Sequence, residues 1–322
     1  MPVCTLSSDL HRRHCLHLAL GLALGTRAAP LLANEGPVWL VSADRGDAYD
    51  EAIAALRAEL PTLPWRTLVP LGLAAVASGG EPSPRAIVTL GSNAYRAVLD
   101  QAATRPALAS VPVVAGLLPR ASFEASPPPR GGPPTTAVWL DPAVDRYLEL
   151  IRRSMPDRLR VGVLFGPTSR ALRAAVVKAA YDRGLELVEA TVQAEELPTA
   201  LAQVLREADV LLALPDAALY NAGTLNNVLM AAYRQRVPVV SYAASHVRAG
   251  ATMALHVTPA LAGRQLAQVV RRVLADRRSL PPPASPGDWA LAVNPQVARS
   301  LGLSLGDTDA LLAGLRRQEG RP

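Results

Sequence analysis

The sequence predicts an α/β protein of two similar lobes, each a parallel sheet flanked by helices. The first observation is that three strand-like apolar runs recur along the chain at nearly constant spacing. The pairs are 38–42 with 161–165, 86–90 with 210–214, and 111–114 with 237–240, at offsets of 123, 124 and 126 positions. The second observation is that helical periodicity follows the first two runs of each half. Two lobes of one build enclose a cleft, and clefts bind ligands.

The apolar pattern also gives the elements in chain order. Ile53, Leu56 and Leu60 recur at helical spacing, whereas short apolar runs predict buried strands. The expected strands are 38–42, 65–68, 86–90, 111–115, 137–140, 161–165, 185–190, 210–214, 237–242, 252–257 and 291–294. The expected helices are 49–60, 93–103, 142–154, 169–183, 197–207, 224–236, 259–276 and 295–301. The proline- and glycine-rich stretch 126–134 predicts an exposed loop ahead of the crossing between lobes.

The C-terminal elements exceed what two equal lobes require, so we expect the chain to return to the first lobe. The N-terminal lobe is expected to hold residues 34–136 plus about 257–282. The C-terminal lobe is expected to hold residues 137–256 plus about 287–312. Such a path predicts a hinge made of multiple crossings.

Residues 1–33 read as a signal peptide. Arg12 and Arg13 precede an apolar run at 16–25, which suits a signal peptide and is too short to span a bilayer of about 30 Å. Cleavage after Ala28 or Ala33 is expected, through either the general or the twin-arginine export route. The mature protein is therefore expected in the periplasm, and no later stretch is long and apolar enough to cross a membrane.

Composition excludes several function classes. Both cysteines, Cys4 and Cys15, lie in the expected signal peptide, and only His246 and His256 remain beyond it. The mature chain therefore has no disulfide, and too few histidines for a histidine-rich zinc site. Basic charge is almost all scattered arginine, which argues against nucleic-acid binding. The nucleophile-elbow, phosphate-loop and dinucleotide-binding motifs are also missing, so we expect no enzyme, no catalytic residue and no cofactor.

Several segments resemble ABC-transporter substrate-binding proteins. The matching stretches are 160–167 (RVGVLFGP), 214–216 (LPD), 237–240 (VPVV), 247–251 (VRAGA), 263–265 (GRQ) and 292–294 (AVN). The resemblance covers roughly residues 36–305 and implies a type I periplasmic-binding-protein fold with a small organic solute between the lobes. The loops at Gly91-Ser92-Asn93, at 117–120 and at 256–259 depart from the family pattern, so the resemblance does not carry the ligand's identity.

Candidate ligand-binding residues lie where parallel strands end and helices begin, because helix N-termini there offer free N–H donors. In the first lobe these are Ser92, a natural N-cap, and Asn93. In the second lobe Thr168 and Ser169 hold the corresponding place. Each pair could contact the ligand or only cap a helix. A ligand between the lobes would touch both sets.

Further candidates follow the later strands of each lobe. Asp216 could hold a ligand amine or cap a helix, and Tyr220 could pack on a ligand or close the edge of the lobe. Arg248, in an expected loop, suits a carboxylate, a phosphate or a surface ion pair, and His246 beside it is more often structural.

Two weaker sets of candidates complete the expected site. Arg120 and Ser122 stand in the first-lobe loop that corresponds to the loop of Arg248. Because aromatic content is only 4%, an aromatic lining would have to draw on a few residues such as Trp39, Tyr95, Tyr220 and Tyr242.

The targeting segment and the resemblance together predict a periplasmic solute-binding protein that delivers its ligand to an inner-membrane ABC permease. The alternative is a periplasmic sensor of the same fold that acts with a membrane receptor or kinase. Either protein is expected to be a monomer that binds a small-molecule solute and no metal.

Overall fold

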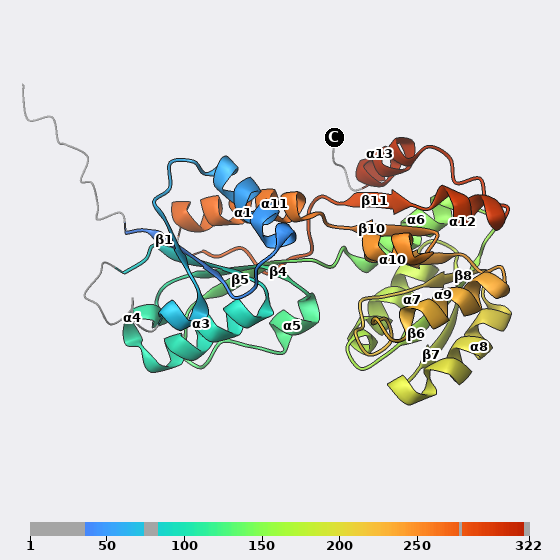
Figure 1. Ribbon diagram of the computed structural model, residues 1–322, viewed down its shortest axis with the longest axis horizontal. Helices are drawn as coiled ribbons and strands as arrows, with labels where there is room; N and C mark the ends of the chain where they lie inside the picture. Colours follow the sequence, from blue (N-terminus) through green and yellow to red (C-terminus); the bar gives the residue numbers. More distant parts are fainter. Residues whose placement is uncertain (1–35, 74–82, 277–278, 319–322) are drawn as a thin grey trace, which may run out of the picture. The chain divides into compact units, whose positions relative to one another are not determined.

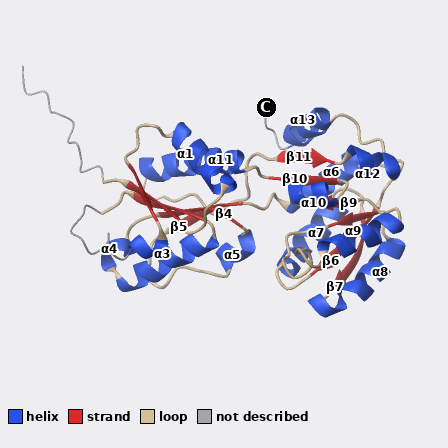
Figure 2. Cartoon of the chain, viewed as in Figure 1, coloured by secondary structure: helices blue, strands red, loops and turns tan. Residues whose placement is uncertain are grey.

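The computed structural model describes residues 36–73, 83–276 and 279–318, and these described residues belong to one compact unit. The predicted signal peptide lies outside the described residues. Two separate sheets carry the described fold (Figures 1 and 2). The predicted strands at 111–115 and 237–242 fall in different sheets, so the two-lobed α/β fold is confirmed.

The first sheet has five parallel strands in the order β2-β1-β3-β4-β5. They are β1 (Val38–Ser42), β2 (Trp65–Leu68), β3 (Ala86–Leu90), β4 (Val113–Leu118) and β5 (Thr135–Trp139). Its helices are α1 (Asp47–Glu59), α3 (Ser92–Thr104), α4 (Pro106–Ala109), α5 (Arg120–Glu124) and α11 (Pro259–Ala275).

Alternation along β1 explains how both faces of the first sheet are covered. Val38 and Leu40 pack in one apolar cluster with α1 and α11, whereas Trp39 and Val41 pack in another with α3 and α4. A parallel strand buried on both faces is apolar throughout, and for this reason the sequence predicted the strand at 38–42. Figure 1 shows α1 and α11 side by side on one face and α3 on the other.

The second sheet has six strands in the order β11-β10-β9-β8-β6-β7. They are β6 (Arg160–Phe165), β7 (Glu186–Thr191), β8 (Val210–Leu212), β9 (Val239–Ser241), β10 (Met253–His256) and β11 (Ala290–Val293). The helices of this lobe are α6 (Val144–Ser154), α7 (Arg173–Tyr181), α8 (Leu197–Glu207), α9 (Leu225–Arg234), α10 (Ala244–Ala249), α12 (Pro295–Ser300) and α13 (Thr308–Gln318). Short 3₁₀ turns, η1 (Ser169–Leu172) and η2 (Ala194–Glu196), precede α7 and α8.

One sequence expectation about the sheets is wrong, and one strand runs against its neighbour. The stretch 137–140 was expected to open the C-terminal lobe, but β5 pairs with β4 in the first sheet, so the first lobe extends to Trp139. The strand β11 at 290–293 is antiparallel to β10, whereas the other pairs of this sheet are parallel. It enters the sheet from the third crossing, after α11, so its direction depends on the route of the crossings and not on a local apolar pattern.

Over the residues that the structure describes, the chain crosses between the lobes three times. The first crossing runs from β5 to α6 at 140–143, and the second from β10 to α11 at 257–258. The third follows a backbone bridge in which Ala284 pairs with Val138, and it then passes through 285–289 to β11. The expected hinge of multiple crossings is therefore present.

Buried polar side chains fasten the third crossing to both lobes. Gln265 of α11 accepts hydrogen bonds from the backbone N–H groups of Gly287 and Asp288 and donates to the carbonyl oxygen of Asp288 at 3.1 Å. Arg146 of α6 donates to the carbonyl oxygen of Pro286 at 2.5 Å and lies 3.9 Å from the centre of the Trp289 ring. One helix from each lobe thus holds the third crossing in place.

Candidate ligand-binding pocket

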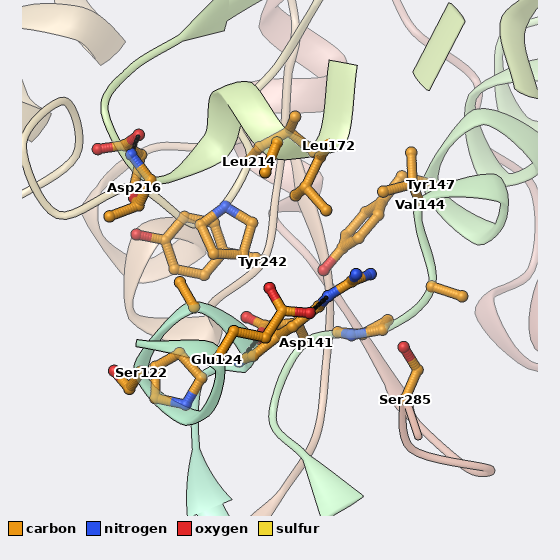
Figure 3. A pocket seen from close by; sticks show the side chains of 18 of the residues that line it. Ser122, Glu124, Asp141, Val144, Tyr147, Leu172, Leu214, Asp216, Tyr242 and Ser285 are labelled. Atoms are coloured by element: carbon orange, nitrogen blue, oxygen red, sulfur yellow. Dashed lines mark hydrogen bonds and ion pairs between the residues drawn. The ribbon is translucent and has the colours of Figure 1, made fainter. Parts of the chain in front are cut away.

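A pocket of about 240 Å³ lies where strands of both sheets end. Its walls come from the loop and helix after β4, the first crossing and the start of α6, the loops after β6, β8 and β9, and Ser285 of the third crossing. Carboxyl ends of parallel strands are the usual location of ligands in α/β folds. The two sheets therefore contribute to one site (Figure 3).

Apolar side chains form much of the wall. The lining includes Val144 and Tyr147 of α6, Leu172 of η1, and Leu214 and Tyr242, which follow β8 and β9. In Figure 3, Leu172 and Leu214 lie on the side of the pocket opposite Ser122 and Glu124. The walls therefore suit a ligand with an apolar body.

The two tyrosines are fixed by the second lobe. The hydroxyl of Tyr147 donates to the carbonyl oxygen of Leu255 at 3.2 Å, and burial raises the pKa of Tyr147 well above its ordinary value. Burial, with the nearby carboxylates of Asp216 and Asp141, raises the pKa of Tyr242 to about 12. Both rings therefore stay neutral at physiological pH. His246 packs edge-on against Tyr242 at 4.8 Å between ring centres.

Asp216 joins two loops of the second lobe through its buried carboxylate. Its Oδ2 accepts hydrogen bonds from the N–H of Thr168 (3.0 Å), the N–H of Ser169 (2.9 Å) and the Oγ of Ser169 (2.9 Å). Its Oδ1 accepts from the N–H of Ala218 at 3.1 Å. Burial raises the pKa of Asp216, but these hydrogen bonds outweigh it and hold the pKa below its ordinary value.

Arg120 stands at the opposite wall and is engaged within the first lobe. Its Nε forms an ion pair with Glu124 at 2.7 Å, one helical turn away. Its guanidinium lies 5.0 Å from the centre of the Trp139 ring. Its backbone N–H donates to Oδ2 of Asp141 at 2.5 Å.

Asp141 lies in the first crossing, at the pocket wall. Burial raises the pKa of its carboxyl, and the hydrogen bond and positive charge of Arg120 offset that rise only in part. A carboxylate that is partly withdrawn from water and lines a pocket has a cost in stability that a ligand can offset.

The structure brings some of the predicted site residues together and separates others. Thr168 and Asp216 line the pocket. Ser169 is buried beneath it, hydrogen-bonded to Asp216. Tyr220 is buried in the core of the second lobe, and its ring is not part of the pocket wall. The weaker candidates Arg120, Ser122 and Tyr242 all line the pocket.

The other predicted site residues lie outside this pocket. Ser92 and Asn93 open α3, and the Oδ1 of Asn93 accepts a hydrogen bond from Arg96 at 2.7 Å. The expectation that Ser92 caps this helix is wrong, because Gly91, at φ 87°, holds the N-cap position. Arg248 was expected in a loop but is exposed on α10. A ligand contact of these three residues stays a prediction.

Sequence reasoning missed Asp141, Tyr147 and Ser285, because they lie on the crossings and on α6 rather than after a central strand. The signal that could have found Asp141 is its place directly after the last strand of the first lobe, which the misplaced boundary at residue 137 concealed. Within the described residues, no group of three or more histidine, cysteine or acidic side chains could hold a metal ion. None of the described helices meets the length and apolarity needed to cross a membrane.

The fold has two α/β lobes that both line one pocket, an arrangement typical of proteins that bind a small ligand. The profile of the family described as ABC transporter substrate binding protein matches residues 129–313. The chain belongs to this family.

Several solved structures of low sequence identity have a similar fold. A ligand-free, open substrate-binding protein with adhesive properties from Clostridium difficile has a TM-score of 0.65 at 15% identity, covering 85% of this chain and 97% of its own. The ABC domain from Streptococcus pneumonia in complex with L-Trp has a TM-score of 0.57 at 14% identity, covering 87% and 99%. A periplasmic ribose ABC transporter from Conexibacter woesei has a TM-score of 0.52 at 14% identity, covering 86% and 97%. These likenesses support the type I periplasmic-binding-protein fold, and no curated protein matches the chain.

Proposed function

We propose that the chain is a periplasmic protein that captures a small organic solute in this pocket and delivers it to an ABC importer in the inner membrane. The observation that carries the proposal is the pocket itself, which both lobes build from the ends of their strands. Typical ligand pockets measure roughly 300–1,000 Å³. The volume of about 240 Å³ lies just below this range and therefore suits a small solute.

The three crossings give a physical basis for capture. A ligand that touches both lobes binds more tightly to the arrangement of the lobes in which it contacts both. The ligand shifts the equilibrium between arrangements by the difference in its affinity for them. A permease that recognises the ligand-bound arrangement would then distinguish loaded from empty protein.

A binding screen tests solute capture. The chain from Asn34 onward, without the predicted signal peptide, is titrated with amino acids, amines, nucleosides, sugars and short peptides while its melting temperature is followed. A ligand at a hundredfold excess over its Kd stabilises the folded state by about 2.7 kcal/mol, enough to see. Uptake of the same solute by vesicles that carry the cognate permease tests delivery.

A periplasmic sensor of the same fold is the second candidate. The loops at 91–93 and 117–120 differ from the family pattern at the places where strands end, and this difference favours a changed role. A sensor would bind its solute in the same pocket but would co-purify with a receptor or kinase instead of a permease. Crosslinking of the loaded protein in spheroplast membranes separates the two functions.

A further inference from the structure

The charge of the pocket narrows the class of solute, on the assumption that the proposed function holds. An anionic ligand needs free N–H donors or a free cation. In α/β folds the loop at a helix N-terminus normally supplies these donors. The loop between β6 and η1 is such a place in the second lobe.

Those donors already have an internal acceptor. The N–H groups of Thr168 and Ser169 and the hydroxyl of Ser169 all point to Oδ2 of Asp216, at 2.9 to 3.0 Å. A ligand carboxylate entering this loop would have to displace a buried carboxylate that is better positioned than itself. It would also meet the negative charge of Asp216. This wall therefore disfavours an anion.

The cation of the other wall is also engaged. Arg120 pairs with Glu124 at 2.7 Å and lies over the ring of Trp139. The pair is exposed and worth at most about 1 kcal/mol, but Glu124 compensates the charge of Arg120, so this wall offers an anion no uncompensated cation. Of the described residues that line the pocket, Arg120 is the one arginine, and none is a lysine or a histidine.

The carboxylate of Asp141 is the acceptor that remains available to bind a ligand. Asp141 receives its hydrogen bond from a backbone N–H and not from the guanidinium of Arg120. It lies on the first crossing beside the rings of Tyr147 and Tyr242 in the lining (Figure 3). A carboxylate next to neutral aromatic rings is a favourable setting for an ammonium group, which gains charge-assisted hydrogen bonds and a cation–π contact.

We infer that the pocket takes a small organic amine, a protonated ammonium on an apolar body that carries no carboxylate, and that Asp141 holds the ammonium. The apolar body would rest against Leu172, Leu214 and Tyr242. Among the described pocket carboxylates, Asp141 has neither several donors from another loop, as Asp216 has, nor a side-chain ion pair, as Glu124 has, so an ammonium would supply the missing partner. This inference rests on the proposed function and adds the substrate class to it.

Matched probe sets test the inference without a variant. Each set shares one apolar body and changes only its charge, as in tryptamine, tryptophan and indole-3-acetate, or phenethylamine, phenylalanine and phenylacetate. Calorimetry on the chain from Asn34 onward is expected to rank the amine at least tenfold tighter than the zwitterion, with no detectable binding of the acid. A set in which the zwitterion or acid binds more tightly overturns the inference and leaves solute capture intact.

A variant identifies the carboxylate that holds the amine. Asp141→Asn keeps shape and removes charge, and it is expected to weaken amine binding tenfold or more. Asp145→Asn is the matched control, because Asp145 follows closely in the chain, in the first turn of α6, but is exposed and outside the pocket. Unchanged amine affinity in Asp141→Asn overturns the assignment. If a sugar or nucleoside binds and no amine does, the inference fails while the proposed function stands. If no solute of any class binds, both fail.

Discussion

Asp216 Oδ2 lies 2.9 Å from both the backbone nitrogen and the Oγ of Ser169, which stands 47 positions earlier in the chain. The carboxylate therefore ties the loop after β6 to the loop after β8. Gly166 takes part in this junction, because its N–H donates to Ser169 Oγ at 2.9 Å. A β-carbon at Gly166 would also meet the carboxylate of Asp216 well inside van der Waals contact, so only glycine fits there without a shift.

Asp216→Ala is expected to destabilise the fold by about 2–3 kcal/mol, because hydrogen bonds to a charged buried acceptor are worth more than neutral ones and their donors are left unsatisfied. Urea unfolding at pH 7 measures the change. Asp182→Ala is the control, since Asp182 is exposed and pairs with Lys178 on the surface of the same lobe. Equal unfolding midpoints for the two variants would show that Asp216 is not the junction.

Asp141 gives a prediction about the pH dependence of stability, and its sign is opposite to that of a carboxylate whose pKa is lowered by folding. Its pKa is raised in the folded state, so stability is lost as pH rises from the ordinary aspartate pKa through the raised value. Asp141→Asn removes that loss, and the melting temperature of the ligand-free variant is expected to exceed that of the wild type at pH 7. At a pH below the ordinary aspartate pKa the difference should disappear. Melting curves of both proteins across this pH range measure the difference in melting temperature. A variant less stable than the wild type at pH 7 would contradict the prediction.

Periodicity and run length were enough to predict most strands and long helices, because central strands such as β1 and β3 are buried on both faces and most long helices have one apolar face. Leu197–Glu207 matches its predicted bounds, and α11 ends one residue early. Short helices escaped, since α5 and α10 span less than two turns and show no period. The C-terminal helix α13 was also missed.

The candidate site was less predictable than the fold. Thr168 and Asp216 were predicted as site residues because each follows a strand, and the carboxyl ends of parallel strands lie at the same edge of a sheet. Only the position of the nearest strand in the sequence is needed for this prediction. Asp141 and Ser285 depend on how the crossings are routed, which is set by contacts between distant segments such as the bridge of Val138 with Ala284. Asp216 was expected to meet a ligand amine or cap a helix, and the structure gives it backbone donors from another loop.

Gln265 gives a prediction about the hinge. Its buried side chain bonds the third crossing at Gly287 and Asp288, so Gln265→Leu is expected to lower the free energy of unfolding by about 2 kcal/mol through lost and unsatisfied hydrogen bonds. Amide hydrogen exchange at 287–288 should rise with it. Gln268→Leu, an exposed position on the same helix, is the control and should leave exchange unchanged. Unaltered exchange in Gln265→Leu would mean that other contacts hold the crossing.

The last prediction concerns the close approach of α1 and α11, the helix that returns to the first lobe. A β-carbon at Gly263 would fall against the carbonyl oxygen of Ala52, well inside van der Waals contact, and 3.0 Å from the Cβ of Ala55. The neighbours are backbone and a short side chain, so they cannot swing away. Gly263→Ala is therefore expected to cost about 1–3 kcal/mol by overpacking, although the same change normally favours a helix.

Gly314→Ala in α13 is the matched control, because the atom nearest its added methyl group belongs to the flexible side chain of Arg153. We expect that variant to be neutral or slightly more stable in urea unfolding. If both variants gain stability, the two helices of the first lobe do not meet as closely as the packing of Gly263 indicates.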